Sequence, residues 1–116
     1  MDFPSTNDFL AEFGIEPEET DPSLAFYRYA QSSTDGMVNL EISFSMIMKS
    51  FEAVLTGLSG RRLAIISSEG VKCINLWRDD TGAGLHVTFD IRGTTSEVRV
   101  TLEPDLSFCW WTLLNE

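Results

Sequence analysis

The one histidine of the chain, His86, lies in a segment that could bring it close to reactive polar side chains. Thr88 and Asp90 follow it at two and four residues, and alternate residues of a strand share a face about 7 Å apart. A histidine beside a carboxylate can act as a general base or bind a metal ion. A zinc site needs three or four ligands, however, and a solvated histidine is more typical of such a strand. We therefore expect no catalytic residue, metal or cofactor here.

A pair of adjacent carboxylates, Asp79 and Asp80, has the composition of a cation site or of a glycosidase cleft. The pair begins the sequence DDTGAG (79–84), in which aspartate and glycine are the residues that form turns. The chain has no Gly-x-Ser-x-Gly motif, and no glycine-rich phosphate loop links a strand to a helix. These patterns predict a protein that is not an enzyme.

The two cysteines, Cys73 and Cys109, are far apart in the sequence, and each lies in an apolar run. Without a Cys-x-x-Cys motif, they predict buried, reduced thiols in a cytoplasmic protein, with a disulfide between neighbouring strands as the alternative. The first residues have neither the basic nor the apolar region of a signal peptide. No stretch approaches the roughly 18 apolar residues of a membrane span.

Two adjacent tryptophans, Trp110 and Trp111, stand near the end of the chain. A strand sends neighbouring side chains to opposite faces, so the two indoles must face different surroundings. One of them is then either exposed or covered by the N-terminal helix. An exposed tryptophan beside charged residues is typical of a binding hot spot. We select Trp111 as the candidate aromatic anchor.

The charge of the chain indicates the class of partner. The sequence has 18 acidic and 8 basic residues, a net charge of −10, and its first 21 positions hold seven acids and no Lys or Arg. A small soluble domain usually carries a net charge of about 2–8. Such a negative field repels nucleic acid and anionic membranes and attracts a basic protein. Solubility alone is the other explanation of the charge.

The elements that must position these residues follow from hydrophobic patterning. Ser5 and Asp8 form a capping box for a short helix that ends at Gly14, and a polar loop is expected over 15–22. From Leu24 onward, alternating apolar residues and turn signals every ten to twelve residues predict an antiparallel meander. The predicted fold class is α+β, with about six mainly antiparallel strands and an N-terminal helix on or beside the sheet.

The segment 45–58 fits two structures. Its apolar residues fall at helical spacing, and Ser45 and Gly60 could cap a helix. Phe51 and Leu55 also fit an alternating strand that keeps the rhythm of the meander, and the balance leans slightly to the strand. We expect one domain over 1–116, with an acidic helix and loop in 1–23 and a β-rich body in 24–116.

Several segments resemble small immunity proteins of bacterial polymorphic-toxin and contact-dependent inhibition systems. They are EISFSMIMKSFEAVL (41–55), ISSEGVKCINLWRD (66–79), GLHVTFDIRGTTSEVRVTLEPDL (84–106) and WWTLLN (110–115), about half of the chain. The resemblance implies a non-enzymatic cytoplasmic inhibitor that binds a cognate toxin, often a basic nuclease, and covers its functional surface. Another acidic interaction module, such as a secretion chaperone or a phage-encoded inhibitor, is the alternative.

Charge complementarity selects the candidate contacts for a basic toxin domain. Carboxylates supply steering and specificity, and a buried aromatic residue supplies affinity. The candidates are the acids of the N-terminal segment, of the predicted turn and of the polar strand faces, together with the anchor: Glu16, Glu18, Glu19, Asp79, Asp80, Asp90, Glu97, Glu103 and Trp111. We also expect Arg99 to pair with Asp90 across neighbouring strands.

Overall fold

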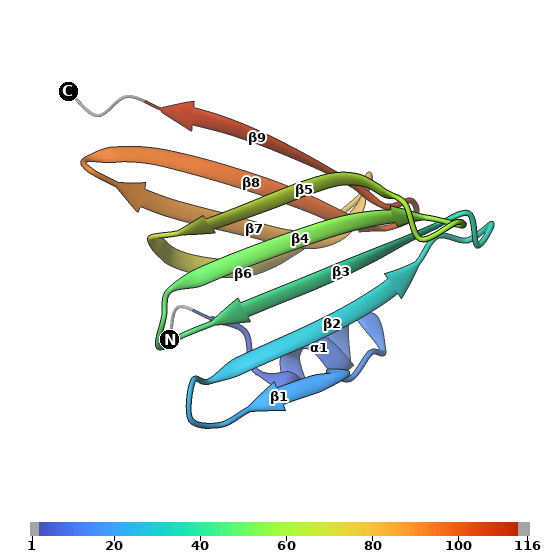
Figure 1. Cartoon of the computed structure of the whole chain (residues 1–116), viewed down its shortest axis with the longest axis horizontal. Helices are drawn as coiled ribbons and strands as arrows, with labels where there is room; N and C mark the ends of the chain where they lie inside the picture. Colours follow the sequence, from blue (N-terminus) through green and yellow to red (C-terminus); the bar gives the residue numbers. More distant parts are fainter. Residues whose placement is uncertain (1–2, 114–116) are drawn as a thin grey trace.

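The computed structural model describes residues 3–113 as one short helix and two antiparallel β-sheets (Figure 1). Strands β1 to β5 form the first sheet and β6 to β9 the second, each in chain order. The elements are α1 (Thr6–Phe13), β1 (Glu19–Asp21), β2 (Phe26–Ser32), β3 (Val38–Ser45), β4 (Ser50–Gly57), β5 (Arg62–Glu69), β6 (Val71–Asp79), β7 (Gly82–Ile91), β8 (Thr94–Glu103) and β9 (Ser107–Leu113).

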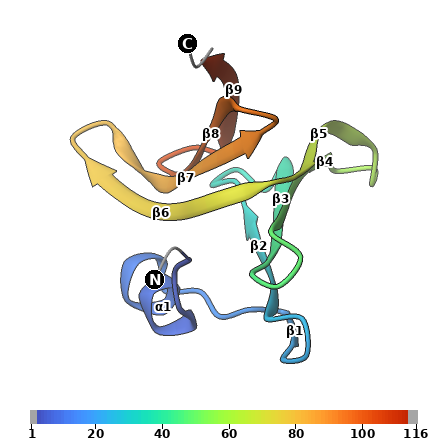
Figure 2. The same ribbon diagram turned by 90° about the vertical axis from the view of Figure 1, so that its left-hand side faces the viewer.

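Helix α1 begins and ends as its sequence predicts. The Ser5 hydroxyl accepts a hydrogen bond from the Asp8 backbone N–H at 3.1 Å, and an Asp8 carboxylate oxygen accepts from the Ser5 N–H at 2.9 Å. The helix ends at Gly14, which is left-handed. Its Phe9 is fully buried and stacks on Tyr29 of β2, with ring centroids 3.9 Å apart. The helix therefore covers part of the inner face of the first sheet (Figure 2).

The inner faces of the two sheets form one apolar core, in which Phe51 of β4 meets Phe89 of β7 edge to face at 6.3 Å. The chain passes from one sheet to the other at Gly70, which separates β5 from β6 by a single residue. Its φ of +83° is left-handed, and a Cβ there would lie 2.9 Å from the Asp90 carbonyl oxygen. Glycine is therefore required where β5 continues into β6 (Figure 2).

The α+β class and the N-terminal helix are confirmed, but residues 3–113 contain nine strands rather than about six. The segment 45–58 is not a helix: Ser45 ends β3, residues 46–49 turn, and β4 follows. The predicted polar loop over 15–22 is partly wrong, because Glu19–Asp21 pairs with β2 and Ile15 packs against the core. The sequence also predicts a last strand over 106–114, and its final residue, Leu114, lies outside the described residues.

The expectation of buried thiols is also wrong. Cys73 is half-buried and Cys109 is exposed, and both are free. They lie on β6 and β9, with β7 and β8 between them, so they are not on neighbouring strands. Cys73 lies opposite Thr88, and Cys109 lies opposite Arg99. Thr88 and Arg99 are on the outer face of the second sheet, so both thiols face away from the core. The described residues include no helix with the length and apolarity of a membrane span.

Candidate functional site

The outer face of the second sheet brings together side chains from all four of its strands. The register places Asn75 of β6 opposite His86 of β7, His86 opposite Arg99 of β8, and Glu97 of β8 opposite Trp111 of β9. Residues opposite one another in antiparallel strands share a face. The resulting hollow is about 400 Å³. We call this surface the tryptophan face and define it by Asn75, Trp77, Asp79, His86, Glu97, Arg99 and Trp111.

One half of the tryptophan face is built on Trp77. Its indole N–H donates to the Leu85 carbonyl oxygen at 3.2 Å, which fixes the ring across β7. The guanidinium carbon of Arg99 lies 3.9 Å from the ring centroid, an arrangement in which the cation is attracted by the π-electrons. Arg99 also donates to an Asp79 carboxylate oxygen at 3.4 Å. Arg99 therefore pairs with Asp79, and the predicted pairing with Asp90 is wrong.

Gly84 of β7 allows a close approach of β7 to β8 in the sheet that carries this arrangement. It lies opposite Trp77, and the β7–β8 register shifts beside it. A Cβ on Gly84 would fall 1.8 Å from the Val100 carbonyl oxygen, far inside van der Waals contact. Only glycine allows the backbones of β7 and β8 to approach so closely at this position.

The turn after β6 holds Asp79 ionised. Its carboxylate accepts hydrogen bonds from the Thr81 hydroxyl at 2.5 Å and the Thr81 backbone N–H at 2.8 Å. These bonds, the hydroxyl first, lower the pKa of Asp79 below its usual range, and Arg99 contributes a smaller part. The tryptophan face thus keeps a fixed negative charge next to the stacked guanidinium.

The other half of the tryptophan face is built on Glu97. One of its carboxylate oxygens accepts from the Trp111 indole N–H at 2.7 Å, and the other lies 3.3 Å from Nε2 of His86. The His86 and Trp111 rings are 6.1 Å apart. The carboxylate near His86 is therefore Glu97 across the strand pair, whereas the sequence suggested Asp90 on the same strand.

This geometry suits recognition by contact. Trp and Arg are the residue types enriched in binding hot spots, and here hydrogen bonds and stacking hold them in place before any partner arrives. No group of three or more His, Cys, Asp or Glu side chains in residues 3–113 is arranged to hold a metal ion.

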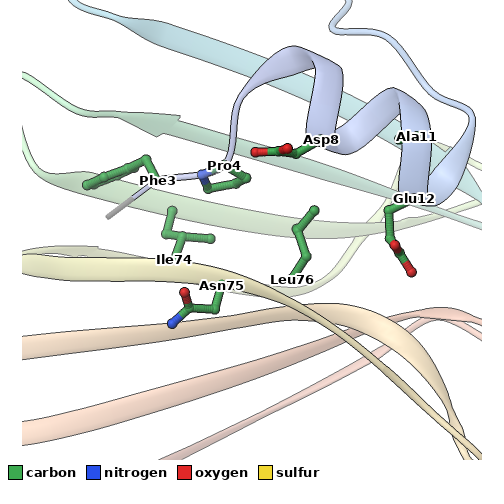
Figure 3. A pocket seen from close by; sticks show the side chains of 8 residues that line it. All are labelled: Phe3, Pro4, Asp8, Ala11, Glu12, Ile74, Asn75 and Leu76. Atoms are coloured by element: carbon green, nitrogen blue, oxygen red, sulfur yellow. The ribbon is translucent and has the colours of Figure 1, made fainter. Parts of the chain in front are cut away.

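A groove beside β6 extends the candidate surface on the other side of that strand. It lies between β6 and α1, has a volume of about 360 Å³, and is lined by Phe3, Pro4, Asp8, Ala11, Glu12, Ile74, Asn75 and Leu76. Figure 3 shows Ile74 and Leu76 pointing from β6 towards α1, with Asn75 on the opposite side of the strand. Because Asn75 also lines the tryptophan face, the two hollows adjoin.

The groove has an apolar floor and an acidic rim. Asp8 and Glu12 lie one turn apart on α1 and line the groove. Arg78 of β6 holds the helix in place, because it binds the Glu12 carboxylate and donates to the Glu12 carbonyl oxygen at 2.9 Å. Its remaining contact is with Glu103 at 3.2 Å. These contacts fix one wall of the groove.

The structure brings some of the predicted contact residues together and separates others. Asp79, Glu97 and Trp111 belong to the tryptophan face. Glu103 and Asp90 lie on β8 and β7 of the same sheet, and Asp80 lies in the β6–β7 turn. The remaining three are on or just before β1, on the far side of the molecule from β9 in Figures 1 and 2: Glu16, Glu18 and Glu19.

Sequence reasoning missed Trp77 and Arg99 as members of the site. The available signal was alternation along β6, which puts Trp77 on the same face as the polar Asn75. The pairing of β6 with β7, and of β7 with β8, then carries that face to Arg99. Strand register was the missing information.

Comparison with known proteins adds one result. No protein-family model matches the sequence, and no curated protein matches it. A search of solved structures matches one chain of a contact-dependent growth inhibition toxin–immunity protein complex from Klebsiella pneumoniae 342. The two chains share a fold. The TM-score is 0.86 at 15% sequence identity, and the match covers 97% of this chain and 96% of that chain.

Proposed function

We propose that this chain is an immunity protein that binds a cognate bacterial toxin and neutralises it by covering the functional surface of the toxin. The observation that carries the proposal is the fold shared, over nearly the whole of both chains, with a component of a toxin–immunity complex. The segments that resemble immunity proteins support the same conclusion from sequence. The chain acts by occupying a surface and carries out no reaction.

Charge assigns the chain to the immunity side of such a pair and indicates the kind of toxin. A net charge of −10 would repel a nucleic-acid substrate, and it would speed association with a basic domain. A toxin that cuts nucleic acid needs a basic surface around its cleft. We therefore expect a basic, nuclease-type toxin domain as the partner, bound in the cytoplasm.

The tryptophan face is the surface we assign to the toxin. Trp77, Arg99 and Trp111 supply the anchors, and Asp79 and Glu97 supply negative charge beside them. Asp90 and Glu103 lie on β7 and β8 of the same sheet, and Asp80 lies in the β6–β7 turn, but Glu103 contacts Arg78 rather than this centre. The β1 acids lie elsewhere and contribute to long-range attraction only.

Neutralisation is tested directly by expressing this chain together with the toxin domain encoded next to it. We expect the chain to restore growth and to co-purify with that domain. Growth arrest despite full expression of both proteins, with no complex on size-exclusion chromatography, would contradict the proposal.

Paired variants then test the surface. Trp111→Ala removes an anchor from the tryptophan face, whereas Trp110→Ala removes the neighbouring indole, which stacks on Phe89 from the inner side. A hot-spot residue contributes about 2 kcal/mol or more, so we expect Trp111→Ala to weaken binding about 30-fold or more. Titration calorimetry, with both variants first shown to be folded by circular dichroism, measures the difference. Equal affinities for the two variants would remove Trp111 from the interface.

A further inference from the structure

Strand β5 is an open edge of the first sheet. It is the last strand in the order β1 to β5, and it is paired along β4 (Figure 2). None of its eight residues is buried, and Leu63 and Ile65 are 54% and 50% exposed. Its inner-facing Ala64 and Ile66 are only half-buried. A long apolar edge of this kind presents unpaired backbone groups to any further strand.

The usual protections of an edge are weak along β5. Proteins blunt such edges with lysine, proline, bulges or inward-pointing charges. The sequence RLAIISSE (62–69) has no lysine or proline and places its charges only at its ends. The one irregularity of register lies near the start of the strand, opposite Leu55 and Thr56, and leaves 64–69 regular.

The charges at the two ends of β5 are complementary to each other. Arg61 and Arg62 are exposed at the beginning of the strand, and Glu69 is exposed at its end. An antiparallel copy of the strand centred on Ile65 would place Ile65 opposite itself and Ala64 opposite Ile66 of the copy. Residues that face outward would then meet outward-facing residues, as sheet geometry requires. The arginine end of each copy would lie against Glu69 of the other.

We propose that β5 pairs with β5 of a second copy of this chain, across a two-fold axis at Ile65, and joins the two first sheets into one continuous sheet. A two-fold interface must be complementary to itself, and β5 meets that requirement in its end charges and in the residues that would face one another. The interface is distinct from the tryptophan face, so dimer and toxin complex are compatible. The inference goes beyond the proposed function and does not rest on it.

The oligomeric state of the purified full chain provides the first test. Sedimentation equilibrium should give twice the mass of one chain. Ile65→Lys places like charges opposite each other at the axis, so we expect a dimer dissociation constant at least about tenfold higher. The matched control is Leu10→Lys, the same change at an exposed residue of α1, which should leave the dimer intact. A monomeric wild-type chain, or equal effects of the two variants, would overturn the proposal.

Charge exchange provides a second test that does not depend on the apolar centre. Glu69→Arg alone, and Arg61→Glu with Arg62→Glu, should each weaken self-association because like charges then meet at both ends. Mixing these two variants should restore a dimer of one copy of each, since both ends are again complementary. No recovery on mixing would contradict the register. A monomeric chain whose binding to the toxin is lost with Ile65→Lys would instead assign this edge to the toxin and overturn self-pairing.

Discussion

The Tyr29 side chain is enclosed between α1 and the first sheet. It is 1% exposed and stacks on Phe9, with an interplanar angle of 12°. Its hydroxyl has no hydrogen-bond partner among residues 3–113. Leaving a buried polar group without a partner costs about 1–3 kcal/mol, so this hydroxyl opposes folding while the ring favours it.

Tyr29→Phe should therefore stabilise the protein, because it keeps the stacked ring and removes the unpaired hydroxyl. We expect a gain of about 1 kcal/mol in the free energy of unfolding. Urea denaturation followed by circular dichroism measures it. Tyr27→Phe, at a half-buried position on the same strand, is the matched control and should show no such gain.

The same residue predicts a loss of stability at alkaline pH. Burial raises the pKa of Tyr29 to about 12, and the nearby Tyr27 adds a smaller part. The unfolded chain releases this proton near its ordinary pKa of about 10. Its contribution is therefore complete below pH 10 and is lost as the pH rises from about 10 to 12. Between about pH 10 and 12, the midpoint temperature of thermal unfolding should fall less steeply for Tyr29→Phe than for the wild-type protein. The same pH dependence of the midpoint in both proteins would contradict the assignment.

At the scale of single residues, the sequence placed the two indoles on opposite faces but did not show which is more exposed: Trp110 is 39% exposed, whereas Trp111 is half-buried. Adjacent indoles had to face opposite ways, and the two do differ, since Trp110 stacks on Phe89 and Trp111 donates to Glu97. The stacking of Arg99 on Trp77 was not predictable, because it depends on a register across three strands. Alternation along one strand shows which face of the sheet a side chain is on, but it does not show which residues of the neighbouring strands lie beside it.

At the scale of elements, local signals predicted the antiparallel meander, but with about six strands rather than nine, and not how the strands divide between two sheets. The helix cap and the recurring turns predicted α1 and the meander. The short strand β1 was not predicted, because Glu19–Asp21 is polar. It is stabilised by pairing with β2 and by the contact of Arg28 with Glu19 at 3.1 Å. The division into two sheets rests on Gly70, a single residue that sequence patterning does not distinguish from an ordinary turn glycine.

The pairing of β7 with β8 gives a prediction for Gly84→Ala. The new methyl group would collide with the Val100 carbonyl oxygen, and overpacking of this kind costs about 1–3 kcal/mol. Gly57→Ala is the control, because a Cβ there finds its nearest neighbour, Leu63, at 3.7 Å and φ is not left-handed. Chemical denaturation should show a large loss for the first variant and little change for the second. Equal stabilities would mean that β7 and β8 separate without cost.

At the scale of the whole molecule, the negative charge is spread over both sheets rather than gathered on one face. Acids occur at β1 and around the tryptophan face, and three arginines each bind carboxylates: Arg28, Arg78 and Arg99. A distributed charge acts at long range and does not by itself select a binding face. If the proposed function holds, we expect the aromatic residues of the tryptophan face to determine where the toxin docks.

If charge provides long-range attraction and the aromatic residues provide the contact, salt and mutation should change different rate constants of toxin binding. Raising the ionic strength should slow association with the toxin domain about tenfold or more, because screening weakens steering. Trp111→Ala should act mainly on dissociation, because it removes a short-range contact. Stopped-flow measurements over a salt series distinguish the two rates. An association rate constant that does not change with ionic strength would show that electrostatic steering plays no part in binding.

The tryptophans and tyrosines are divided between the two sheets, so the intrinsic optical signals of the protein distinguish one sheet from the other. All three tryptophans lie on β6 and β9, and both tyrosines lie on β2. Indole emission therefore observes one sheet, and phenol absorbance observes the other, without any added label. If Gly70 transmits strain between the sheets, the two optical signals should change together on heating. Signals that separate would reveal a state in which one sheet has melted and the other has not.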